Sequence, residues 1–514
     1  MEIASENLAT VAIVLVAVGV LVWGYYRSRP YGKLGILSWL QSVSLMAPWL
    51  LFFGLFAAGI YLNLAGILIL IVLSAGLYIY LGRQVRAASQ DPQLRAQLQR
   101  KFNRTDAAES PSESEPTSES ESDNGDDAPS PQSPQSATPD AETVKMPLDD
   151  LRAVQGIFGI DTFFATETIP YQDGAIFKGN LRGRDSEVVH DRLSRALEER
   201  LGDRYRLFLV ENQEGKPVVV VLPSRNDPKP MSATQKGLAL VLLLATLATT
   251  LEAIGFVLGF DLFFNLDRLS EPLPYAVGIW VVLIAHELGH YAIARRYNVR
   301  LSWPFFLPTW QIGSFGAITR FESLLPNRKA LFDIALAGPA AGGLVSLAML
   351  VVGLLLSSPD SVFQIPAQFF KSSILVGTLA KVVLGSDLQQ VAVGIHPLAI
   401  LGWFGLVINA INLMPAGQLD GGRIVQSIYS RKIAGRATVA TLILLGVASF
   451  ANPLALFWAV VILVLQRDLE RPSLNELVEP DDARAALGLL ALFLAIAMLI
   501  PLTPSLAGRL GIGG

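Results

Sequence analysis

Two histidines and a glutamate form the most reactive group of side chains in the sequence, within Ala285-His286-Glu287-Leu288-Gly289-His290. On a helix, positions i and i+4 share one face, so both imidazoles can reach the same metal ion. Glu287 projects nearby and can polarise a metal-bound water. Zinc suits such a site, because three protein ligands leave one position open for water. The alternative is a structural pair of histidines bonded to polar groups of neighbouring helices.

A third ligand must come from His, Asp or Glu, because the chain has no cysteine. Of the two remaining histidines, His190 lies in the predicted soluble domain 146–229. His396 is expected at the outer end of a predicted membrane span, on the opposite side of the membrane from the His286–His290 motif. Asp420, within NLMPAGQLDGGR, is the better candidate. Pro415 ends the preceding helix and Gly417 permits close backbone approach, so we expect non-helical backbone to present this carboxylate. Taken alone, an Asp before two glycines is more often part of a turn.

The composition indicates a polytopic membrane protein. Hydrophobic residues make up 52% of the 514 residues and charged residues only 16%, and the mean hydropathy is +0.45. Apolar runs near the ~20 residues needed to cross a bilayer recur along the chain. Two histidines and a glutamate inside such a run are costly, and intramembrane residues of this kind are usually functional.

Three spans are predicted at the N-terminal end, at about 8–26, 40–60 and 63–81. Basic residues follow the first and third spans, which places those ends in the cytoplasm and the N-terminus outside. The first span has no basic residues before it and no small-residue cleavage site after it, so we interpret it as a retained anchor. Seven further spans are predicted near 237–259, 274–294, 331–357, 395–414, 437–450, 453–466 and 486–503.

The predicted total is therefore about ten spans, with both termini outside. The pair at 437–466 is separated by Asn452-Pro453 and could instead be one long kinked helix. Residues 105–145 hold 11 of the 44 acidic residues and only one of the 40 basic ones, leaving 33 acidic and 39 basic residues elsewhere. This Ser/Pro-rich stretch has almost no apolar side chains and is predicted to be a disordered spacer, with a phosphorylated regulatory tail as the alternative.

Residues 146–229 are predicted to form a small soluble α+β domain. Strand composition is found at 162–169, 206–210 and 218–222, and 186–201 has the spacing of a helix with one apolar stripe. His190 lies beside that stripe, where a solvated histidine is expected. The segment Gly179-Asn-Leu-Arg-Gly183 has the composition of a turn before the helix, although a binding loop is the alternative.

The sequence resembles the site-2 protease family of intramembrane zinc metalloproteases. HELGH on a span and the downstream NLMPAGQLDGGR look like the two signatures of that family. Gly313-Ser-Phe-Gly316-Ala-Ile and Ala337-Gly-Pro-Ala-Ala-Gly342 are similar to its re-entrant segment and its Gly-Pro helix. The 179–183 loop, the acidic linker and the added spans resemble the chloroplast and cyanobacterial, EGY-like branch. The likeness covers roughly 237–470, extends to about 150, and is weak over residues 1–145.

This resemblance implies one Zn²⁺ per chain, held by His286, His290 and Asp420. Glu287 is expected to be the general base that activates a zinc-bound water. Asn412 matches an Asn of the family that is expected to bond the substrate backbone or an oxyanion, and a helix-terminal polar cap is the alternative. Residues 303–321 are expected to form a re-entrant strand that pairs with an unwound substrate, or else an interfacial loop. Its substrate-binding candidates are Gly313, Ser314, Phe315 and Gly316.

The predicted fold is thus a polytopic α-helical membrane protein with a site-2 protease-like core and a small soluble α+β domain. The expected segments are three spans in 1–104, the linker 105–145, the soluble domain 146–229, the protease core 230–470 and a C-terminal span in 471–514. The expected activity is peptide hydrolysis within or near transmembrane helices, in regulated intramembrane proteolysis. A membrane chaperone or scaffold that retains a zinc site is the alternative, and a transporter is a third class.

The expected partners are transmembrane protein substrates and the lipid bilayer, and the charge distribution excludes a nucleic-acid footprint. Homo-oligomerisation is left open. The resemblance points to the plasma or thylakoid membrane of a cyanobacterium or a chloroplast. It places the active site near the cytoplasmic or stromal side.

Overall fold

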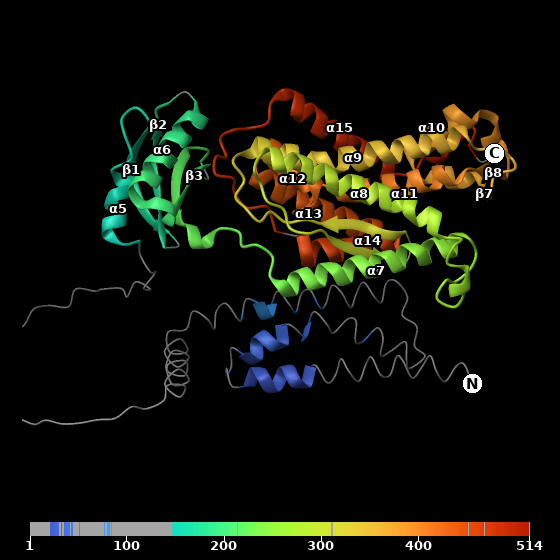
Figure 1. Cartoon of the computed structure of the whole chain (residues 1–514), viewed down its shortest axis with the longest axis horizontal. Helices are drawn as coiled ribbons and strands as arrows, with labels where there is room; N and C mark the ends of the chain where they lie inside the picture. Colours follow the sequence, from blue (N-terminus) through green and yellow to red (C-terminus); the bar gives the residue numbers. More distant parts are fainter. Residues whose placement is uncertain are drawn as a thin grey trace, which may run out of the picture. The chain divides into compact units, whose positions relative to one another are not determined.

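A computed structural model of the chain is shown in Figure 1. It describes scattered positions between 21 and 84 and then residues 146–514, except for 172, 184, 213, 310, 311, 451, 467, 513 and 514. The three predicted N-terminal spans lie almost entirely outside the described residues, and the acidic linker lies wholly outside them. The chain divides into two compact units, residues 1–135 and 136–514. The helices and strands from Leu148 onward all belong to the second unit.

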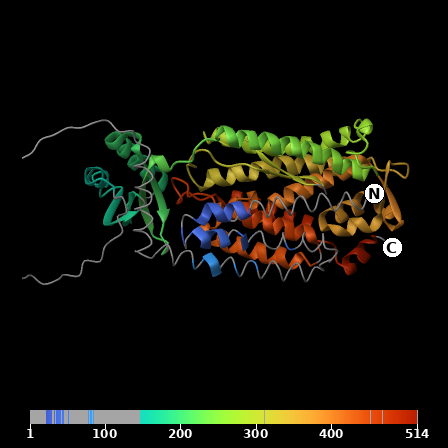
Figure 2. The ribbon, with the colours of Figure 1, turned by 90° about the horizontal axis from the view of Figure 1, so that it is seen from below.

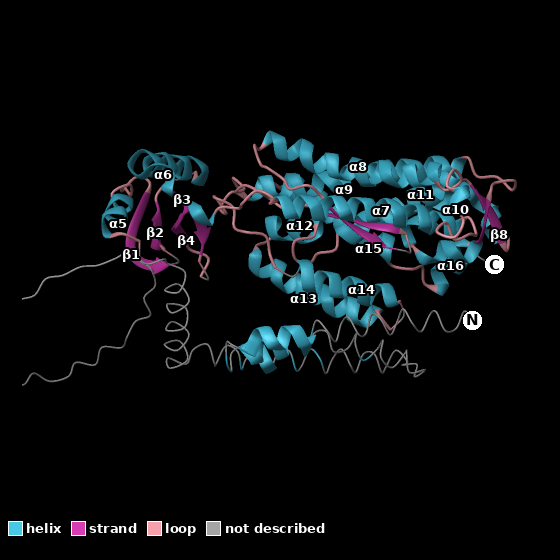
Figure 3. Ribbon diagram, turned by 60° about the horizontal axis from the view of Figure 1, so that its bottom comes forward, coloured by secondary structure: helices cyan, strands magenta, loops and turns pink. Residues whose placement is uncertain are grey.

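The first part of this unit is an antiparallel sheet with two helices on one face (Figure 3). The strand order is β1-β2-β4-β3. Buried side chains of the sheet and of the helices form one apolar core. The elements are α5 (Leu148–Gln155), β1 (Phe163–Tyr171), β2 (Gly174–Leu181), α6 (Ser186–Leu201), β3 (Tyr205–Glu211) and β4 (Pro217–Pro223).

The structure contains the predicted helix and the three predicted strands of this region, and it adds a strand. Residues 179–181 belong to β2, so the prediction of a turn there is wrong. Pairing with β1 and β4 overrides the turn-forming composition of this segment. His190 was expected to be solvated, but it is buried and its Nε2 lies 3.2 Å from the Leu207 carbonyl oxygen.

Four helices of the described residues are long and apolar enough to cross a membrane: α7 (Ala233–Val257), α8 (Leu273–Arg296), α9 (Arg328–Leu355) and α15 (Asp482–Leu499). They coincide with four of the predicted spans. The figure of about ten spans stays a prediction. The other helices of this part include α10 (Ile374–Leu384), α11 (Pro397–Asn412), α12 (Asp420–Ile428), α13 (Arg431–Ala448), α14 (Pro453–Val461) and α16 (Pro504–Leu510).

The long helices lie side by side, as the views in Figures 1 and 2 agree. α9 lies at the centre and packs against α8, α11 and α12. The predicted pair at 437–466 is two helices and not one kinked helix, because α13 and α14 are separate and pack against each other. Asn452 caps the second of them, since its Oδ1 accepts from the Leu454 amide at 3.0 Å.

Two short two-stranded sheets, of which the first is a hairpin, interrupt the helical arrangement. β5 (Phe305–Thr309) pairs with β6 (Gly313–Ile318), and this hairpin packs against α7 and α11. β7 (Phe363–Pro366) pairs with β8 (Ala392–Ile395). The first hairpin lies in the segment predicted to contain a re-entrant strand, so the strand content of that prediction is confirmed.

The segment 471–477 joins the sheet to the helical part. The Leu209 amide of β3 donates to the Leu474 carbonyl at 2.8 Å, and the Glu476 amide donates to the Leu209 carbonyl at 2.9 Å. The Leu474 amide in turn donates to the Leu325 carbonyl, just before α9, at 2.9 Å. The edge of β3 is thereby covered, and the sheet is anchored beside the start of α9.

Candidate metal centre

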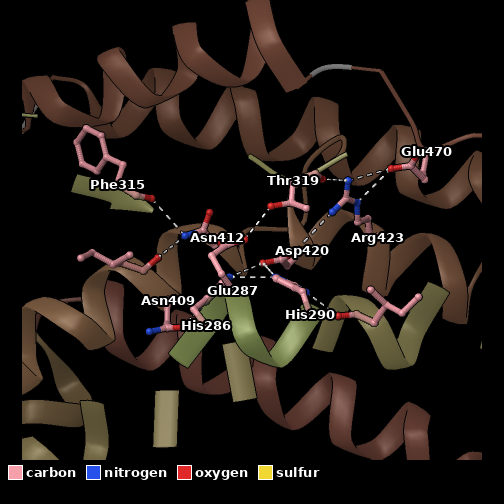
Figure 4. Close-up of polar contacts among 12 residues, drawn as sticks. His286, Glu287, His290, Phe315, Thr319, Asn409, Asn412, Asp420, Arg423 and Glu470 are labelled. Atoms are coloured by element: carbon pink, nitrogen blue, oxygen red, sulfur yellow. Dashed lines mark hydrogen bonds and ion pairs between the residues drawn. The ribbon is translucent and has the colours of Figure 1, made fainter. Parts of the chain in front are cut away.

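The predicted ligands come together inside the helical part (Figure 4). His286 and His290 lie one turn apart on α8, and Asp420 begins α12. The Asp420 Oδ2 lies 3.2 Å from the His286 Nε2 and 3.4 Å from the His290 Nε2, and the two Nε2 atoms are 3.1 Å apart. All three side chains are buried. Among the described residues this is the cluster of His, Asp and Glu side chains able to hold a metal ion.

In each imidazole ring, the hydrogen bond made by Nδ1 determines whether Nε2 carries a proton or a lone pair. The His286 Nδ1 is 2.9 Å from the Asn409 Oδ1, and the His290 Nδ1 is 2.7 Å from the Ile334 carbonyl oxygen. Both of these oxygens can only accept, so both Nδ1 atoms donate and both Nε2 atoms of the neutral rings present lone pairs. The Asn409 orientation is fixed because its Nδ2 donates to the Gly405 carbonyl at 2.8 Å.

Two nitrogen lone pairs and a carboxylate oxygen therefore converge on one point in a buried region. Such an arrangement is repulsive by itself and is relieved by a cation. Ligand atoms bound tetrahedrally to zinc at about 2.0–2.1 Å lie about 3.3–3.4 Å apart. The observed separations of 3.1–3.4 Å match that spacing. The donor set fits zinc in both chemistry and geometry.

A glycine of α9 makes room for one of the ligands. A Cβ atom on Gly338 would lie 2.2 Å from the His290 Nε2 and 2.5 Å from two ring carbons. Any side chain at this position would displace the imidazole. The Gly-Pro sequence noted on α9 therefore serves close packing of α8 against α9 at the ligand, with Pro339 next to it inside the helix.

Asp420 departs from the prediction in its backbone. The carboxylate was expected on non-helical backbone, but Asp420 is the first residue of α12, and the non-helical stretch ends just before it. The positive end of the helix dipole stabilises a carboxylate at this position. The helix also directs Arg423, one turn later, back toward Asp420, with the Arg423 Nη1 3.8 Å from the Asp420 Oδ1.

Glu287, the predicted base, is held by residues that the motif does not contain. Its Oε2 accepts a hydrogen bond from the Thr319 hydroxyl at 2.8 Å. The Thr319 carbonyl accepts from the Arg423 Nη2 at 2.8 Å, and Arg423 forms an ion pair with Glu470 at 3.1 Å. Figure 4 shows this chain of contacts running from the base to Glu470. The base and a ligand are thus connected through a single buried arginine.

Asn412 lies at the end of α11 and contacts the hairpin. Its Nδ2 donates to the Ile408 carbonyl at 2.9 Å and to the Phe315 carbonyl of β6 at 3.2 Å. Gly316 has a φ of 96°, and a Cβ there would lie 2.5 Å from the Asn412 Nδ2. Only glycine allows β6 to approach Asn412 this closely. The four predicted substrate-binding residues, Gly313, Ser314, Phe315 and Gly316, all belong to β6 and are buried.

The space beside the ligands is small. A cavity of about 10 Å³ is lined by residues of α8, β6, α11 and α12, by three loop residues and by Gln466. Thr319, Asn412 and Asp420 are among them. That volume holds about one water molecule. The site as it stands accommodates the small reactant of a hydrolysis but no peptide, so substrate binding requires the hairpin or a neighbouring helix to move.

Sequence reasoning missed the residues that hold the ligands and the base. Asn409 lies one helical turn before Asn412, and Arg423 lies one turn after Asp420, so helical spacing from the predicted residues could have found them. Thr319, Ile334 and Glu470 carry no local signal, because tertiary contacts bring them to the site. His396, judged not to be a ligand, caps α11, where its Nδ1 accepts from the Leu398 amide at 3.2 Å.

Comparisons with known proteins show the family of the chain. Residues 274–451 match the family described as Peptidase family M50, and residues 152–229 match the EGY3 middle domain. The protein named probable zinc metalloprotease EGY2, chloroplastic, of Arabidopsis thaliana is 38% identical over 70% of this chain and 66% of its own length. The one named EGY1, from the same organism, is 37% identical over 70% of this chain and 72% of its own.

A site-2 protease from Methanocaldococcus jannaschii, of known structure, has 17% sequence identity and a TM-score of 0.25, over 51% of this chain and 90% of that one. The chain belongs to the M50, or site-2 protease, family of zinc metalloproteases, in its EGY-like branch. It spans about two thirds of the length of the first relatives named above.

Proposed function

We propose that this protein is an intramembrane zinc metalloprotease that hydrolyses peptide bonds within or near transmembrane helices of other membrane proteins. The observation that carries the proposal is the convergence of the His286, His290 and Asp420 donor atoms beside Glu287, on a helix apolar enough to span a membrane. Ionisable side chains are energetically costly in an apolar segment, and where they occur they are usually functional.

His286, His290 and Asp420 would hold one zinc ion per chain. When bound, zinc supplies Lewis-acid polarisation of a water molecule and of the scissile carbonyl group. Asn409 and the Ile334 carbonyl hold the two rings in the tautomer that binds a cation. Their fixed orientation removes part of the entropy that the ligands would otherwise lose on binding.

Glu287 would act as the general base and then as the general acid. Its carboxylate takes a proton from the attacking water and returns it to the leaving nitrogen, so one side chain serves both transfers. The Thr319 hydroxyl, 2.8 Å from the Glu287 Oε2, fixes which oxygen is free to face the water. The site is buried, so these charge interactions act without competing solvent.

Asn412 and residues 313–316 would bind the substrate. A helix hides its carbonyl groups in hydrogen bonds, so it must unwind before hydrolysis, and an unwound segment can pair with the β5–β6 hairpin. Asn412 bonds the Phe315 carbonyl of that hairpin at 3.2 Å. Release of this contact on substrate binding would free the Asn412 amide to donate to the substrate backbone or to a developing oxyanion.

The protein would act as a multi-pass protein of about ten spans. Its setting would be the plasma or thylakoid membrane of a cyanobacterium or chloroplast, with the metal centre near the cytoplasmic or stromal side. The relatives named above are called chloroplastic, which favours the thylakoid setting. Its partners would be transmembrane protein substrates and the surrounding lipids, with a second copy of the chain as a further candidate.

The test is cleavage of a model single-span substrate by purified protein in detergent, with wild type and Glu287→Gln compared. We expect cleavage within the apolar segment, lost in the variant and lost on zinc chelation. Glu287→Gln keeps the size of the side chain and leaves the three ligands in place, so its zinc content is the control. A wild-type protein that binds one zinc per chain yet cuts no substrate of a panel of helices would instead support a scaffold that retains the metal.

A further inference from the structure

An open groove lies between the four-stranded sheet and the helical part, outside the metal centre. Its volume is about 1200 Å³. One wall is the sheet face that α5 and α6 leave uncovered, and the other is formed by residues around 229–235, 320–324 and 471–472. The wall formed by the sheet consists largely of the apolar residues Ile176, Phe208, Val210, Val220 and Leu222.

The composition of β4 shows that this face differs from an ordinary solvated one. An antiparallel strand with one face in water alternates apolar and polar residues, whereas a run that is apolar throughout belongs to a strand covered on both faces. β4 reads Val218 to Leu222 without a polar residue. Val219 and Val221 pack under the helices and are fully buried, but Val220 and Leu222 face the groove and are only half-buried. They line the open groove, so part of each side chain stays exposed.

The rim of the groove is basic. Lys229, Arg320 and Arg471 are exposed, and within the described part of the chain no acidic side chain lies within ion-pair distance of any of them. The two acidic residues of the lining are already neutralised. Asp173 forms an ion pair with Arg225 at 2.5 Å, and Asp227 forms one with Arg206 at 2.9 Å. The unpaired charge of the groove is therefore positive.

The groove adjoins the series of hydrogen bonds and ion pairs that holds Glu287. Arg320 directly follows Thr319, whose hydroxyl bonds Glu287, and Arg471 directly follows Glu470, which pairs with Arg423. Two residues of the rim are thus each one position from a residue of the network that holds the metal centre. A polypeptide that extends from the hairpin toward the sheet would pass along this rim.

We propose that the groove binds the segment of a substrate that follows its transmembrane helix, as an extended chain with apolar and acidic residues. The apolar side chains would cover Phe208, Val220 and their neighbours, and the acidic ones would face Lys229, Arg320 and Arg471. This inference rests on the proposed protease function, because it assigns the occupant as a substrate. The sheet would then favour substrates whose transmembrane helix is followed by an acidic segment. Substrates with the basic segments that are common at the cytoplasmic ends of spans would bind less well.

The first experiment measures binding without catalysis. The full-length Glu287→Gln protein in detergent is titrated into a fluorescein-labelled peptide of alternating valine and glutamate, and into the same peptide with lysine in place of glutamate. We expect saturable, salt-sensitive binding of the first peptide only. Lys229→Glu with Arg471→Glu should weaken it by about tenfold or more, since both substitutions reverse charges that face the peptide.

The matched control carries the same charge change outside the groove, at Arg152→Glu with Lys216→Glu. Both residues are exposed, with side-chain exposures of 77% and 72%, and neither lines the groove. Val220→Glu tests the apolar wall and should also abolish binding, with its folding checked by circular dichroism. Equal weakening by the control pair would overturn the inference, because it would mark a general charge effect. A third outcome would also overturn the inference: the protein binds phosphatidylglycerol nanodiscs but not the peptide, and Lys229→Glu with Arg471→Glu abolishes the nanodisc binding. The groove would then be a lipid-binding surface.

The second experiment uses cleavage by the wild type. Two substrates share one transmembrane helix, and that helix is followed either by the valine–glutamate segment or by a Gly/Ser segment of equal length. We expect a KM about tenfold lower for the first with equal kcat, and loss of that difference in Lys229→Glu with Arg471→Glu. Cleavage of both substrates with equal KM would overturn the groove inference and leave the protease proposal standing. If the peptide bound but neither substrate were cleaved, the protease proposal would be overturned and the groove would remain a peptide-binding site.

Discussion

The metal centre and the groove beside the sheet are both lined by residues of distant segments, yet they differ in size, in burial and in the pairing of their polar groups. At the metal centre the ligands are buried, each ring has its Nδ1 bonded, and the adjoining cavity measures about 10 Å³. The groove has a volume of about 1200 Å³, and three of its four basic side chains have no acidic partner among the described residues.

Under the functions proposed above, this difference separates two tasks. Bond cleavage needs a fixed geometry and exclusion of bulk water, which a closed and fully bonded site provides. Selection among substrates needs an accessible surface with unsatisfied charge and apolar area, which only an open site provides. Two short connections join the regions: Thr319, bonded to Glu287, precedes Arg320 on the groove, and Glu470, paired with Arg423, precedes Arg471. Substitutions can therefore be sorted by whether they change metal content, turnover or substrate affinity.

The largest effect is expected from removing a ligand. His290→Ala leaves two of the three donors, so zinc should fall far below one per chain and cleavage should be lost entirely. Metal analysis of purified protein, with circular dichroism for folding, measures this. The same substitution at His190, which lies in the sheet domain, is the control and should leave zinc unchanged. Retention of a full zinc in His290→Ala would show that the cluster is not the metal site.

A smaller effect is expected at the partner of a ligand. Asn409→Leu removes the acceptor for the His286 Nδ1, frees the ring to adopt the wrong tautomer, and should lower zinc affinity by about 10–100-fold. Competition with a fluorescent chelator measures that affinity. Asn452→Ala, which removes the cap of α14 far from the ligands, is the matched control. An unchanged zinc affinity in Asn409→Leu would contradict the tautomer assignment.

Thr319 should influence turnover and not metal content. Thr319→Val keeps the shape but removes the donor to Glu287, so kcat should fall by about ten- to a hundredfold while zinc content and KM stay near wild type. Thr319→Ser restores the hydroxyl and should recover most of the activity. If the serine and valine variants were equally impaired, packing and not the hydrogen bond would explain the loss.

The smallest effect is expected where the sheet is anchored. Asn475 donates to the Ser186 carbonyl at 3.0 Å, and its Oδ1 accepts from the Leu477 amide at 3.1 Å. Asn475→Ala should loosen the anchoring segment by about 1 kcal/mol and accelerate hydrogen exchange at the Leu209 and Glu476 amides. KM for substrates with acidic flanks should rise slightly, with zinc content unchanged. A change in zinc content would show that the two regions are more tightly coupled than their contacts indicate.

The sequence predicted those parts of the molecule that depend on local spacing. Two histidines four apart on a helix share a face wherever the helix lies, and the stripe of α6 is buried for the same reason. Asp420 was found because its chemistry is that of a ligand. Its helical backbone was missed, since two glycines after it favour a turn locally. In the structure both glycines belong to α12 and lie close to the backbone of residues 413–417.

The contacts that tune the site could not be predicted, because they join segments far apart in the chain. Ile334 and Thr319 are ordinary residues until α9 and the hairpin lie against α8. Strand β2 was missed for a similar reason, since its pairing partners override a turn-like composition. The groove also needed the structure, because the run of valines in β4 predicts burial on both faces but does not say which face has no cover.

The most direct test of the account measures zinc and cleavage in the same preparations of wild type, Glu287→Gln and Asp420→Ala. We predict one zinc per chain with cleavage in the wild type, one zinc without cleavage in Glu287→Gln, and neither in Asp420→Ala. Asp420→Ala protein that keeps its zinc and cuts the substrate would contradict the assignment of the metal centre.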